Sequence, residues 1–364
     1  MKTTASLKSE LLEAPAILEQ FLSAYFHQNA ERYAYGELFE PLYLDLSEFV
    51  SRRGKRLRPM LFLLAYRLFG GDRKFTDPSL LKSAISVELL HAFILMHDDI
   101  IDQSERRRGL PTFHKLAEER MGKLENRERI GQNVAMVVGD MLFALAVETL
   151  QSTDFPSQSR DAALSRFLRY VTDTGCGEIY DILLGIRDIT RVSEDDIVRM
   201  YNLKTTRYTF EAPIILGGLL AGASPELLGE VEHITNPLGL AFQIQNDLIE
   251  FSHFDITDRA MQTDLLEGKK TLLMRMAFDR LNDLDRSFLQ LCLSSSSLHD
   301  SSIIKIRELI EKSGAVAALR ERMQDLFNRS EKALESAPFT ADQREGLREA
   351  IAFIRQQTQH TGTN

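Results

Sequence analysis

Three aspartates end an apolar stretch of the sequence, HAFILMHDDIID, which runs from residue 91 to residue 102. On an α-helix, Asp98 and Asp102 lie about 40° apart and one turn from each other, and His91 lies within about 20° of Asp98. Two carboxylates on one helical face repel each other unless a cation lies between them. Because these ligands are hard oxygens with no accompanying cysteine, the pattern favours magnesium over zinc. The alternative is a solvated acidic helix end, but the preceding turns are too apolar for a surface helix.

A second polar stripe lies in GLAFQIQNDLIEF, residues 239–251, where Gln243, Asn246, Asp247 and Glu250 follow the spacing i, i+3, i+4 and i+7. This spacing places them on one face of an otherwise apolar helix. Alone, such a stripe is also consistent with a satisfied polar network in a core. Together, the two stripes predict two interior helices that face each other across a cavity and hold magnesium ions, with coordination positions left for phosphate oxygens.

Two basic clusters, RRGKRLRP and ERRRG, interrupt an acidic chain whose formal net charge is −9. The net charge disfavours general binding to nucleic acid, so each cluster needs a local anion. Arginine and lysine would balance the charge that remains on a metal-bound diphosphate. The basic clusters and the acidic stripes are therefore consistent with one diphosphate site.

Helical periodicity dominates the elements that must position these residues, which predicts an all-α protein. The chain has ten prolines and shows no alternating, strand-like segment with hairpin turns. We expect one large helical bundle that forms a single domain over residues 1–364, in which 294–302 is a linker between helices of the same bundle. Helices are expected over residues 14–34, 59–68, 78–102, 131–152, 157–173, 176–185, 193–221, 225–251, 271–282, 302–313 and 315–336.

Composition and the N-terminal sequence predict a soluble cytoplasmic protein without a membrane span. The segment MKTTASLKSELLEAP lacks the apolar centre of a signal peptide, and no apolar run is expected to reach the roughly 20 residues that cross a bilayer. Cys176 and Cys292 lie far apart in the chain. Neither has a partner at metal-ligand spacing, which favours a reducing compartment.

Seven motifs resemble those of the trans-isoprenyl diphosphate synthases, also called polyprenyl synthetases, in their order and approximate spacing. They are GKRLRP, HDDIID, RRRGLPTFH, VVGD, LKT, FQIQND and TDLLEGKKTL, and the match covers residues of about 50–275. The resemblance implies a helical fold of the isoprenoid synthase type, three magnesium ions in each active site and a homodimer. It also implies that an allylic diphosphate is ionised with magnesium and that the cation alkylates isopentenyl diphosphate.

The resemblance also implies a role for individual residues. Catalysis depends on Asp98, Asp102 and Lys204. The metal ligands are Asp98, Asp102, Asn246, Asp247 and Glu250. Isopentenyl diphosphate is held by Lys55, Arg58, His91 and Arg108. The allylic diphosphate is held by Arg107, Lys204, Thr205, Gln243 and Arg259.

Three departures from the family pattern lie around the second acidic motif. Asn246 stands where the family usually has the first aspartate of DDxxD, and Glu250 stands at its last position. Arg259 stands where lysine is usual, and this exchange is not neutral at a phosphate site. Glu178 stands where glutamine is common. These changes leave the first motif and the residues predicted to bind isopentenyl diphosphate intact.

The resemblance favours a geranylgeranyl diphosphate product, with farnesyl diphosphate as the alternative. It selects Phe93, five residues before Asp98, as the side chain that stops chain growth, whereas the helical wheel alone places Ile94 nearer the stripe of Asp98. A class I terpene cyclase or diphosphate lyase is a second hypothesis, but it would not need Lys55 and Arg58. A non-catalytic subunit of a heteromeric prenyl synthase is a third, but it need not keep HDDIID and RRRG.

Overall fold

The computed structural model describes residues 4–33, 36–52, 54–107, 109–252, 268–295 and 298–359. The described residues form an all-α protein, which confirms the predicted class. They divide into two compact units, one made of Met1–Arg166 and Pro213–Ala223 and the other of Phe167–Ala212 and Ser224–Asn364. The predicted single domain over residues 1–364 stays a prediction.

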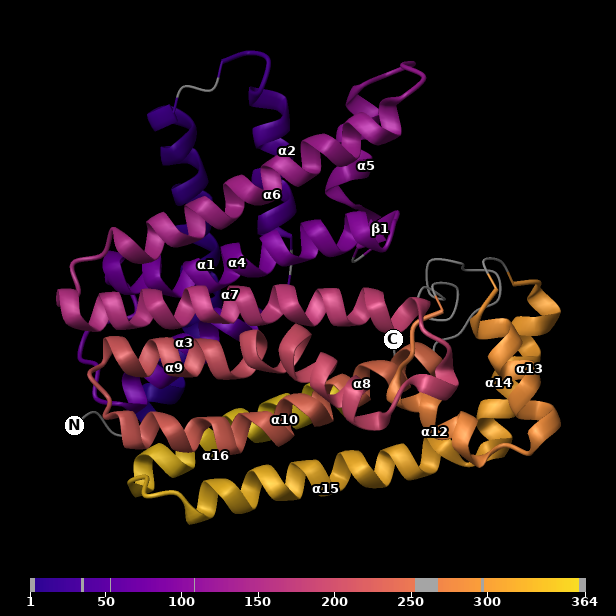
Figure 1. Cartoon of the computed structure of the whole chain (residues 1–364). Helices are drawn as coiled ribbons and strands as arrows, with labels where there is room; N and C mark the ends of the chain where they lie inside the picture. Colours follow the sequence, from indigo (N-terminus) through magenta and orange to yellow (C-terminus); the bar gives the residue numbers. More distant parts are fainter. Residues whose placement is uncertain are drawn as a thin grey trace. The chain divides into compact units, whose positions relative to one another are not determined.

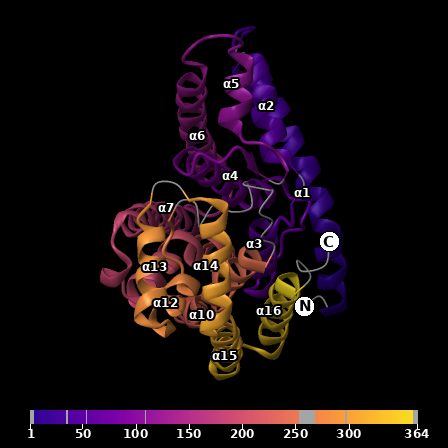
Figure 2. The same ribbon diagram turned by 90° about the vertical axis from the view of Figure 1, so that its right-hand side faces the viewer.

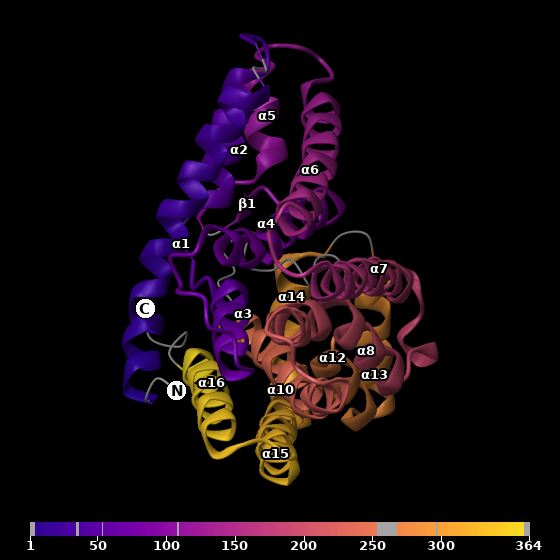
Figure 3. The same cartoon turned by 90° about the vertical axis from the view of Figure 1, so that its left-hand side faces the viewer.

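The first unit is built mainly from the N-terminal helices, coloured indigo to magenta in Figure 1. In this unit α4 packs along α6, and α5 also packs against α6 (Figure 1). Helix α1 runs along α2 and also contacts α3 (Figure 3). Its elements are α1 (Thr4–Tyr33), α2 (Glu40–Ser51), α3 (Leu57–Leu68), α4 (Pro78–Ile101), β1 (Arg106–Arg107), β2 (Leu110–Pro111), α5 (Phe113–Arg120), α6 (Arg127–Gln151), the first part of α7 (Ser157–Ile186) and most of α9 (Ala212–Leu220).

Helix α4 carries the first acidic motif, and local sequence defines its start. The side chain of Asp77 accepts a hydrogen bond from the Leu80 N–H, and Pro78 occupies the first turn, where its missing N–H costs nothing. Most of the helix is buried. The backbone of α6 comes so close that a Cβ atom at Gly139 would lie 2.4 Å from Nε2 of His97. Close packing of these helices thus fixes the end of α4 near His97.

Helices α4 and α6 are also the apolar helices that bear on the membrane prediction. Each is long and apolar enough to cross a membrane by length and composition, contrary to our expectation that no segment reaches that length. In α4, 67% of the apolar window is buried inside the protein, as expected of a core helix, compared with 39% in α6. The absence of a membrane span stays a prediction.

The second unit is centred on the long helix α10, which packs along α15 (Figure 1). Helices α12, α13 and α14 contact one another at one end of this unit (Figure 2). Its elements are the remainder of α7, η1 (Ile189–Arg191), α8 (Glu194–Tyr201), η2 (Asn202–Glu211), α10 (Pro225–Ser252), α12 (Leu272–Arg280), α13 (Asp283–Leu293), α14 (Asp300–Ser313), α15 (Ala315–Ser336) and α16 (Ala341–Gln359).

The expected break near residues 174–175 is wrong, because α7 continues through it from Ser157 to Ile186. Gly177, close to the expected break, is needed for helix packing and does not end a helix. A Cβ atom at Gly177 would lie 2.2 Å from the backbone nitrogen of Lys204, so only glycine allows η2 to come this close. The structure also adds helices α2, α5, α13 and α16, which the sequence pattern had not predicted.

Residues Asn202–Glu211 form a π-helix, η2, between α8 and α9. This segment interrupts the single helix that was expected over residues 193–221, which the structure divides into α8, η2 and α9. Pro213 lies in the first turn of α9, where proline is tolerated. Because π-helical segments are rare and often mark functional sites, η2 supports a functional role for this region.

Candidate active site

The end of α4 brings the two predicted carboxylates together. A carboxylate oxygen of Asp98 and one of Asp102 lie within 4.8 Å of each other. Asp102 is the C-cap of the helix, and its N–H donates to the Asp98 carbonyl at 2.8 Å. Both side chains are half-buried. Two oxygen donors at this separation and partial exposure suit a hydrated divalent cation such as Mg²⁺.

Arg107 binds the acidic end of α4. Its Nε donates to Asp99 Oδ1 at 2.5 Å, and its Nη2 donates to Asp98 Oδ2 at 3.1 Å. Burial raises the pKa of Asp99 to about 7; the charges of Asp98 and Asp102 act in the same direction, and Arg107 opposes them. Burial by itself would lower the pKa of Arg107, but the neighbouring aspartates raise it overall. The guanidinium is therefore held as a cation beside the predicted metal ligands.

A short antiparallel ribbon positions Arg107. Strand β1 pairs with β2, with Arg106 opposite Pro111 and Arg107 opposite Leu110. Gly109 in the connecting turn has a φ of 76°, a conformation that glycine adopts without strain. Our expectation of no hairpin is thus wrong for these residues. Arg108, predicted to bind isopentenyl diphosphate, lies outside the described residues.

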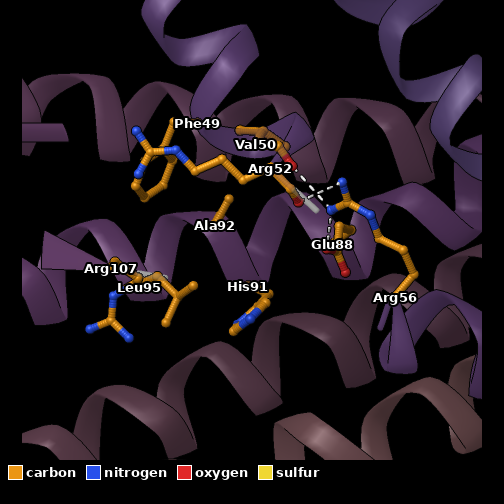
Figure 4. Close-up of a pocket in the computed structure, with 9 residues that line it drawn as sticks. All are labelled: Phe49, Val50, Arg52, Arg56, Glu88, His91, Ala92, Leu95 and Arg107. Carbon is orange, nitrogen blue, oxygen red and sulfur yellow. Dashed lines mark hydrogen bonds and ion pairs between the residues drawn. The ribbon is translucent and has the colours of Figure 1, made fainter. Parts of the chain in front are cut away.

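His91 and Arg107 line one pocket of the first unit (Figure 4). The other lining residues are Phe49, Val50, Arg52, Arg56, Glu88, Ala92 and Leu95. Lys55 and Arg58, which were predicted to act with His91, do not line this pocket but lie on either side of Arg56 in the chain. Lys55 is exposed, although partial desolvation lowers the pKa of its ammonium group.

Asp247 is the hydrogen-bonded centre of the second acidic stripe, on α10. The buried Tyr201 hydroxyl donates a short hydrogen bond to Asp247 Oδ2, and Gln243 Nε2 donates to Oδ1 at 3.2 Å. The Leu272 N–H, at the start of α12, donates to the Tyr201 oxygen at 3.1 Å. Tyr201 therefore joins α8, α10 and α12 through a single hydroxyl group.

The other members of the second stripe are less enclosed. Asn246 is exposed and Glu250 is half-buried, whereas Asp247 is buried. Arg259 lies outside the described residues. Whether Asn246, Asp247 and Glu250 act together as metal ligands, and whether the two stripes face one cavity, stay predictions.

Lys204 of η2 binds two acids of α7. Its Nζ lies 2.9 Å from Glu178 Oε2 and 2.6 Å from Asp181 Oδ2. The departure from glutamine at Glu178 thus places a second negative charge beside Lys204. Thr205 is half-buried next to it. The Lys204 ammonium group of η2 is thus held between two carboxylates of α7. Its role in binding the allylic diphosphate stays a prediction.

Phe93, the predicted chain-length stop, belongs to an aromatic cluster in the first unit. Its ring centroid lies 4.7 Å from that of His97 and 5.5 Å from that of Phe143 on α6. These contacts hold the Phe93 ring between α4 and α6. Ile94 is also half-buried, one residue further along α4.

Sequence reasoning missed three residues that support these groups: Tyr201, Arg56 and Glu88. Glu88 did carry a signal, because it is the only acid between Pro78 and His97 and lies three residues before His91. Arg56 was visible only as part of GKRLRP. Tyr201 gave no signal by spacing, since its partner Asp247 lies in a different helix.

The described fold is that of the isoprenoid synthases. It resembles a solved geranylgeranyl pyrophosphate synthase from Corynebacterium glutamicum, complexed with isoprenyl diphosphate and magnesium, with a TM-score of 0.84 and 26% identity. The alignment covers 95% of this chain and 99% of that chain. The fold, together with the helices that carry the acidic residues, defines an all-α protein of the isoprenoid synthase type.

Sequence comparison gives the family. The Polyprenyl synthetase family matches residues 40–310. The chain is 31% identical over 303 residues to the geranylgeranyl pyrophosphate synthase of Geoglobus acetivorans, covering 81% of this chain and 85% of that protein. It is 28% identical to the geranylfarnesyl diphosphate synthase of Aeropyrum pernix, covering 84% of this chain and 91% of that protein. The chain belongs to the polyprenyl synthetase family, the trans-isoprenyl diphosphate synthases.

Proposed function

We propose that this protein is a short-chain trans-prenyltransferase that condenses isopentenyl diphosphate with an allylic diphosphate and releases mainly geranylgeranyl diphosphate. The observation that carries the proposal is the carboxylate pair of Asp98 and Asp102 at the end of the buried, apolar helix α4. The likeness to proteins named geranylgeranyl pyrophosphate synthases supports the reaction and the product class. Farnesyl diphosphate is the alternative product.

Asp98 and Asp102 would hold magnesium in this reaction, and Asn246, Asp247 and Glu250 are proposed as further ligands, for three ions in all. The paired hard oxygens at the end of α4 fit this ion. When bound, magnesium supplies a Lewis acid that neutralises charge developing on the leaving diphosphate. Arg107 contributes a fixed positive charge at the same helix end without leaving its ion pairs.

The basic residues would hold the two diphosphates. Isopentenyl diphosphate is assigned to Lys55, Arg58, His91 and Arg108. The allylic diphosphate is assigned to Arg107, Lys204, Thr205, Gln243 and Arg259. The apolar turns of α4 before Asp98 exclude water, which would otherwise quench an allylic cation.

A homodimer is part of the proposal, and the exposed face of α7 supports it. Ile179, Ile182, Leu183 and Ile186 are exposed at the spacing i, i+3, i+4 and i+7. An apolar stripe of this kind on a helix favours association, and a second copy of the chain is the proposed occupant. Sedimentation velocity at micromolar concentration tests this against a monomer. The free thiols of Cys176 and Cys292 are consistent with the cytoplasm as the compartment.

One experiment tests the proposed function and separates its rivals. The purified protein is incubated with magnesium and geranyl diphosphate, an allylic substrate shorter than either candidate product, with and without isopentenyl diphosphate, and the products are resolved by chromatography. We expect elongated products only when both substrates are present. Release of diphosphate or a hydrocarbon without isopentenyl diphosphate would indicate a lyase or cyclase, and no reaction in either case would indicate a non-catalytic subunit.

A first prediction concerns Asn246, the neutral member of the second motif. Asn246→Asp should lower the magnesium concentration for half-maximal rate by roughly three- to tenfold, because a charged ligand gains more from the ion than an amide does. The exposed position accepts the added charge without burial. Gln245→Glu adds the same charge one residue away, off the stripe, and should leave the requirement unchanged. A magnesium titration that gives equal or higher values for Asn246→Asp would exclude Asn246 as a ligand.

A second prediction concerns the Tyr201 hydroxyl. Tyr201→Phe removes the donor that orients Asp247 and should raise the magnesium requirement by about 10- to 100-fold, as for other partners of metal ligands. Tyr170→Phe is the matched control, because the buried Tyr170 also donates to a carboxylate, Glu211, at 2.7 Å. Magnesium titration and calorimetric binding of Mn²⁺ should distinguish the two variants. If both variants shift the requirement equally, the effect belongs to general stability and not to Asp247.

A further inference from the structure

Arg56 occupies an unusual backbone position in the first unit. It precedes α3 as its N-cap residue, with a φ of 46° and a ψ of 35°, in the left-handed region. A non-glycine residue is sterically strained in this region, and such a conformation persists only where surrounding contacts impose it. The contacts at Arg56 come from its own side chain, which is directed into the protein.

The Arg56 guanidinium joins three elements. Nη1 donates to the Val50 carbonyl at 3.0 Å and to Glu88 Oε1 at 2.6 Å, and Nη2 donates to the Arg52 carbonyl at 3.1 Å. Val50 and Arg52 lie at the C-terminal end of α2, where free carbonyls favour a cation. Figure 4 shows the guanidinium directed at this helix end and at Glu88 of α4. One side chain thus fixes the end of α2, the start of α3 and the middle of α4.

The pair formed by Arg56 and Glu88 is buried, with side-chain exposures of 3% and 9%. Removing one partner of such a pair leaves the other charge uncompensated, so the geometry depends on both. Glu88 lies one helical turn before His91 on α4, and both residues line the same pocket. Lys55 precedes Arg56 on the loop before α3, and Arg58 lies in the first turn of α3. The pair therefore connects the segment that carries two predicted phosphate-binding cations, Lys55 and Arg58, to the helix that carries His91.

We propose that Arg56 and Glu88 are positioning residues for isopentenyl diphosphate: their ion pair sets the direction in which Lys55 and Arg58 leave the backbone relative to His91. This inference rests on the proposed function, because it assigns the anion to isopentenyl diphosphate. Neither Arg56 nor Glu88 contacts the substrate. Their effect is on the preorganisation of the groups that do.

The test is a comparison of steady-state constants. Arg56→Met should raise KM for isopentenyl diphosphate on the order of tenfold or more, because a small displacement of binding groups has large effects. KM for the allylic diphosphate and kcat at saturation should change less than about twofold. Lys204, Thr205 and Gln243 belong to η2 and α10, and Arg107 is held by its own ion pairs with Asp98 and Asp99. Arg56→Lys keeps the charge opposite Glu88 and should recover part of the loss. Glu88→Gln keeps a neutral acceptor and should raise the same KM.

Arg67→Met is the matched control. Arg67 also donates to a carboxylate, Glu10, and to two backbone carbonyls, those of Gly71 and Arg73, in the same unit. Its loss should lower thermal stability to a similar degree while KM for isopentenyl diphosphate stays unchanged. If Arg56→Met does not fold, Glu88→Gln and Arg56→Lys decide the question by the same constants.

A failure of the proposed function can be distinguished from a failure of the positioning role of Arg56 and Glu88. If the unaltered protein does not condense isopentenyl diphosphate with an allylic diphosphate, the proposed function is wrong. If the unaltered protein is active but Arg56→Met and Glu88→Gln bind isopentenyl diphosphate with unchanged affinity in calorimetry, only the positioning role is wrong. Parallel increases in both KM values would also overturn it, because they would show a general loss of structure.

Discussion

Asp98→Ala is expected to lower kcat on the order of 10³-fold while the helical fold is retained, since one electrostatic group at a reacting centre commonly contributes a factor of this size. Asp98 lies at the half-buried end of α4, with 16% of its side chain exposed. Its removal leaves Arg107 paired with Asp99 at 2.5 Å, so no buried cation loses its only partner. Without Asp98, the carboxylate pair with Asp102 is lost, and with it the proposed magnesium site.

The measurement is the rate of product formation at saturating magnesium, together with far-UV circular dichroism of the same sample. Glu105→Ala is the control, because Glu105 is an exposed acid a few residues beyond the motif and has no proposed role. It should turn over at the normal rate. Undiminished turnover by Asp98→Ala, or loss of helicity in that variant, would contradict the assignment of Asp98 as a magnesium ligand.

The long helices could be predicted because their caps and apolar periodicity lie within the segment itself. The Asp77 cap and Pro78 mark the start of α4 in the sequence. Helix α5 has only eight residues and is polar on much of its surface. Helices this short are marginal alone and depend on tertiary contacts, which the sequence does not display. For α13 a signal was present, because Asn282, taken as a helix end, is the N-cap whose side chain accepts from the Asp285 N–H.

In the candidate site too, contacts within one helix could be predicted from the sequence, whereas contacts between helices could not. Pairs at i and i+4 follow from helix geometry alone, and both Asp98 with Asp102 and Gln243 with Asp247 are close in the structure. Partners from different helices do not follow from spacing. Thus Tyr201 opposite Asp247 could not be read from the sequence, and neither could the inward direction of Arg56, which depends on a left-handed backbone.

Product length is expected to depend on Phe93, and Phe93→Ala should lengthen the main product by at least one isoprene unit. Under the proposed function, a growing prenyl chain would extend from the proposed metal site along α4, where each turn rises about 5.4 Å, comparable to one isoprene unit. The Phe93 ring is held against His97 and Phe143, so it cannot easily move aside for a longer chain. Replacing it with alanine opens space between α4 and α6. Gas chromatography of the dephosphorylated products measures the change.

Ile94→Ala is the informative comparison, because the helical wheel places Ile94 nearer to the stripe of Asp98 than Phe93. If Phe93 is the stop, the alanine variant at 93 yields longer chains and the variant at 94 does so much less. Truncating a core Ile or Phe side chain to alanine costs about 2–5 kcal/mol of stability, so both variants are assayed well below their unfolding temperatures. Chains of about thirty carbons or more from the unaltered protein, or an unchanged distribution in Phe93→Ala, would contradict the assignment. A longer product from Ile94→Ala alone would transfer the role to the neighbouring face of α4.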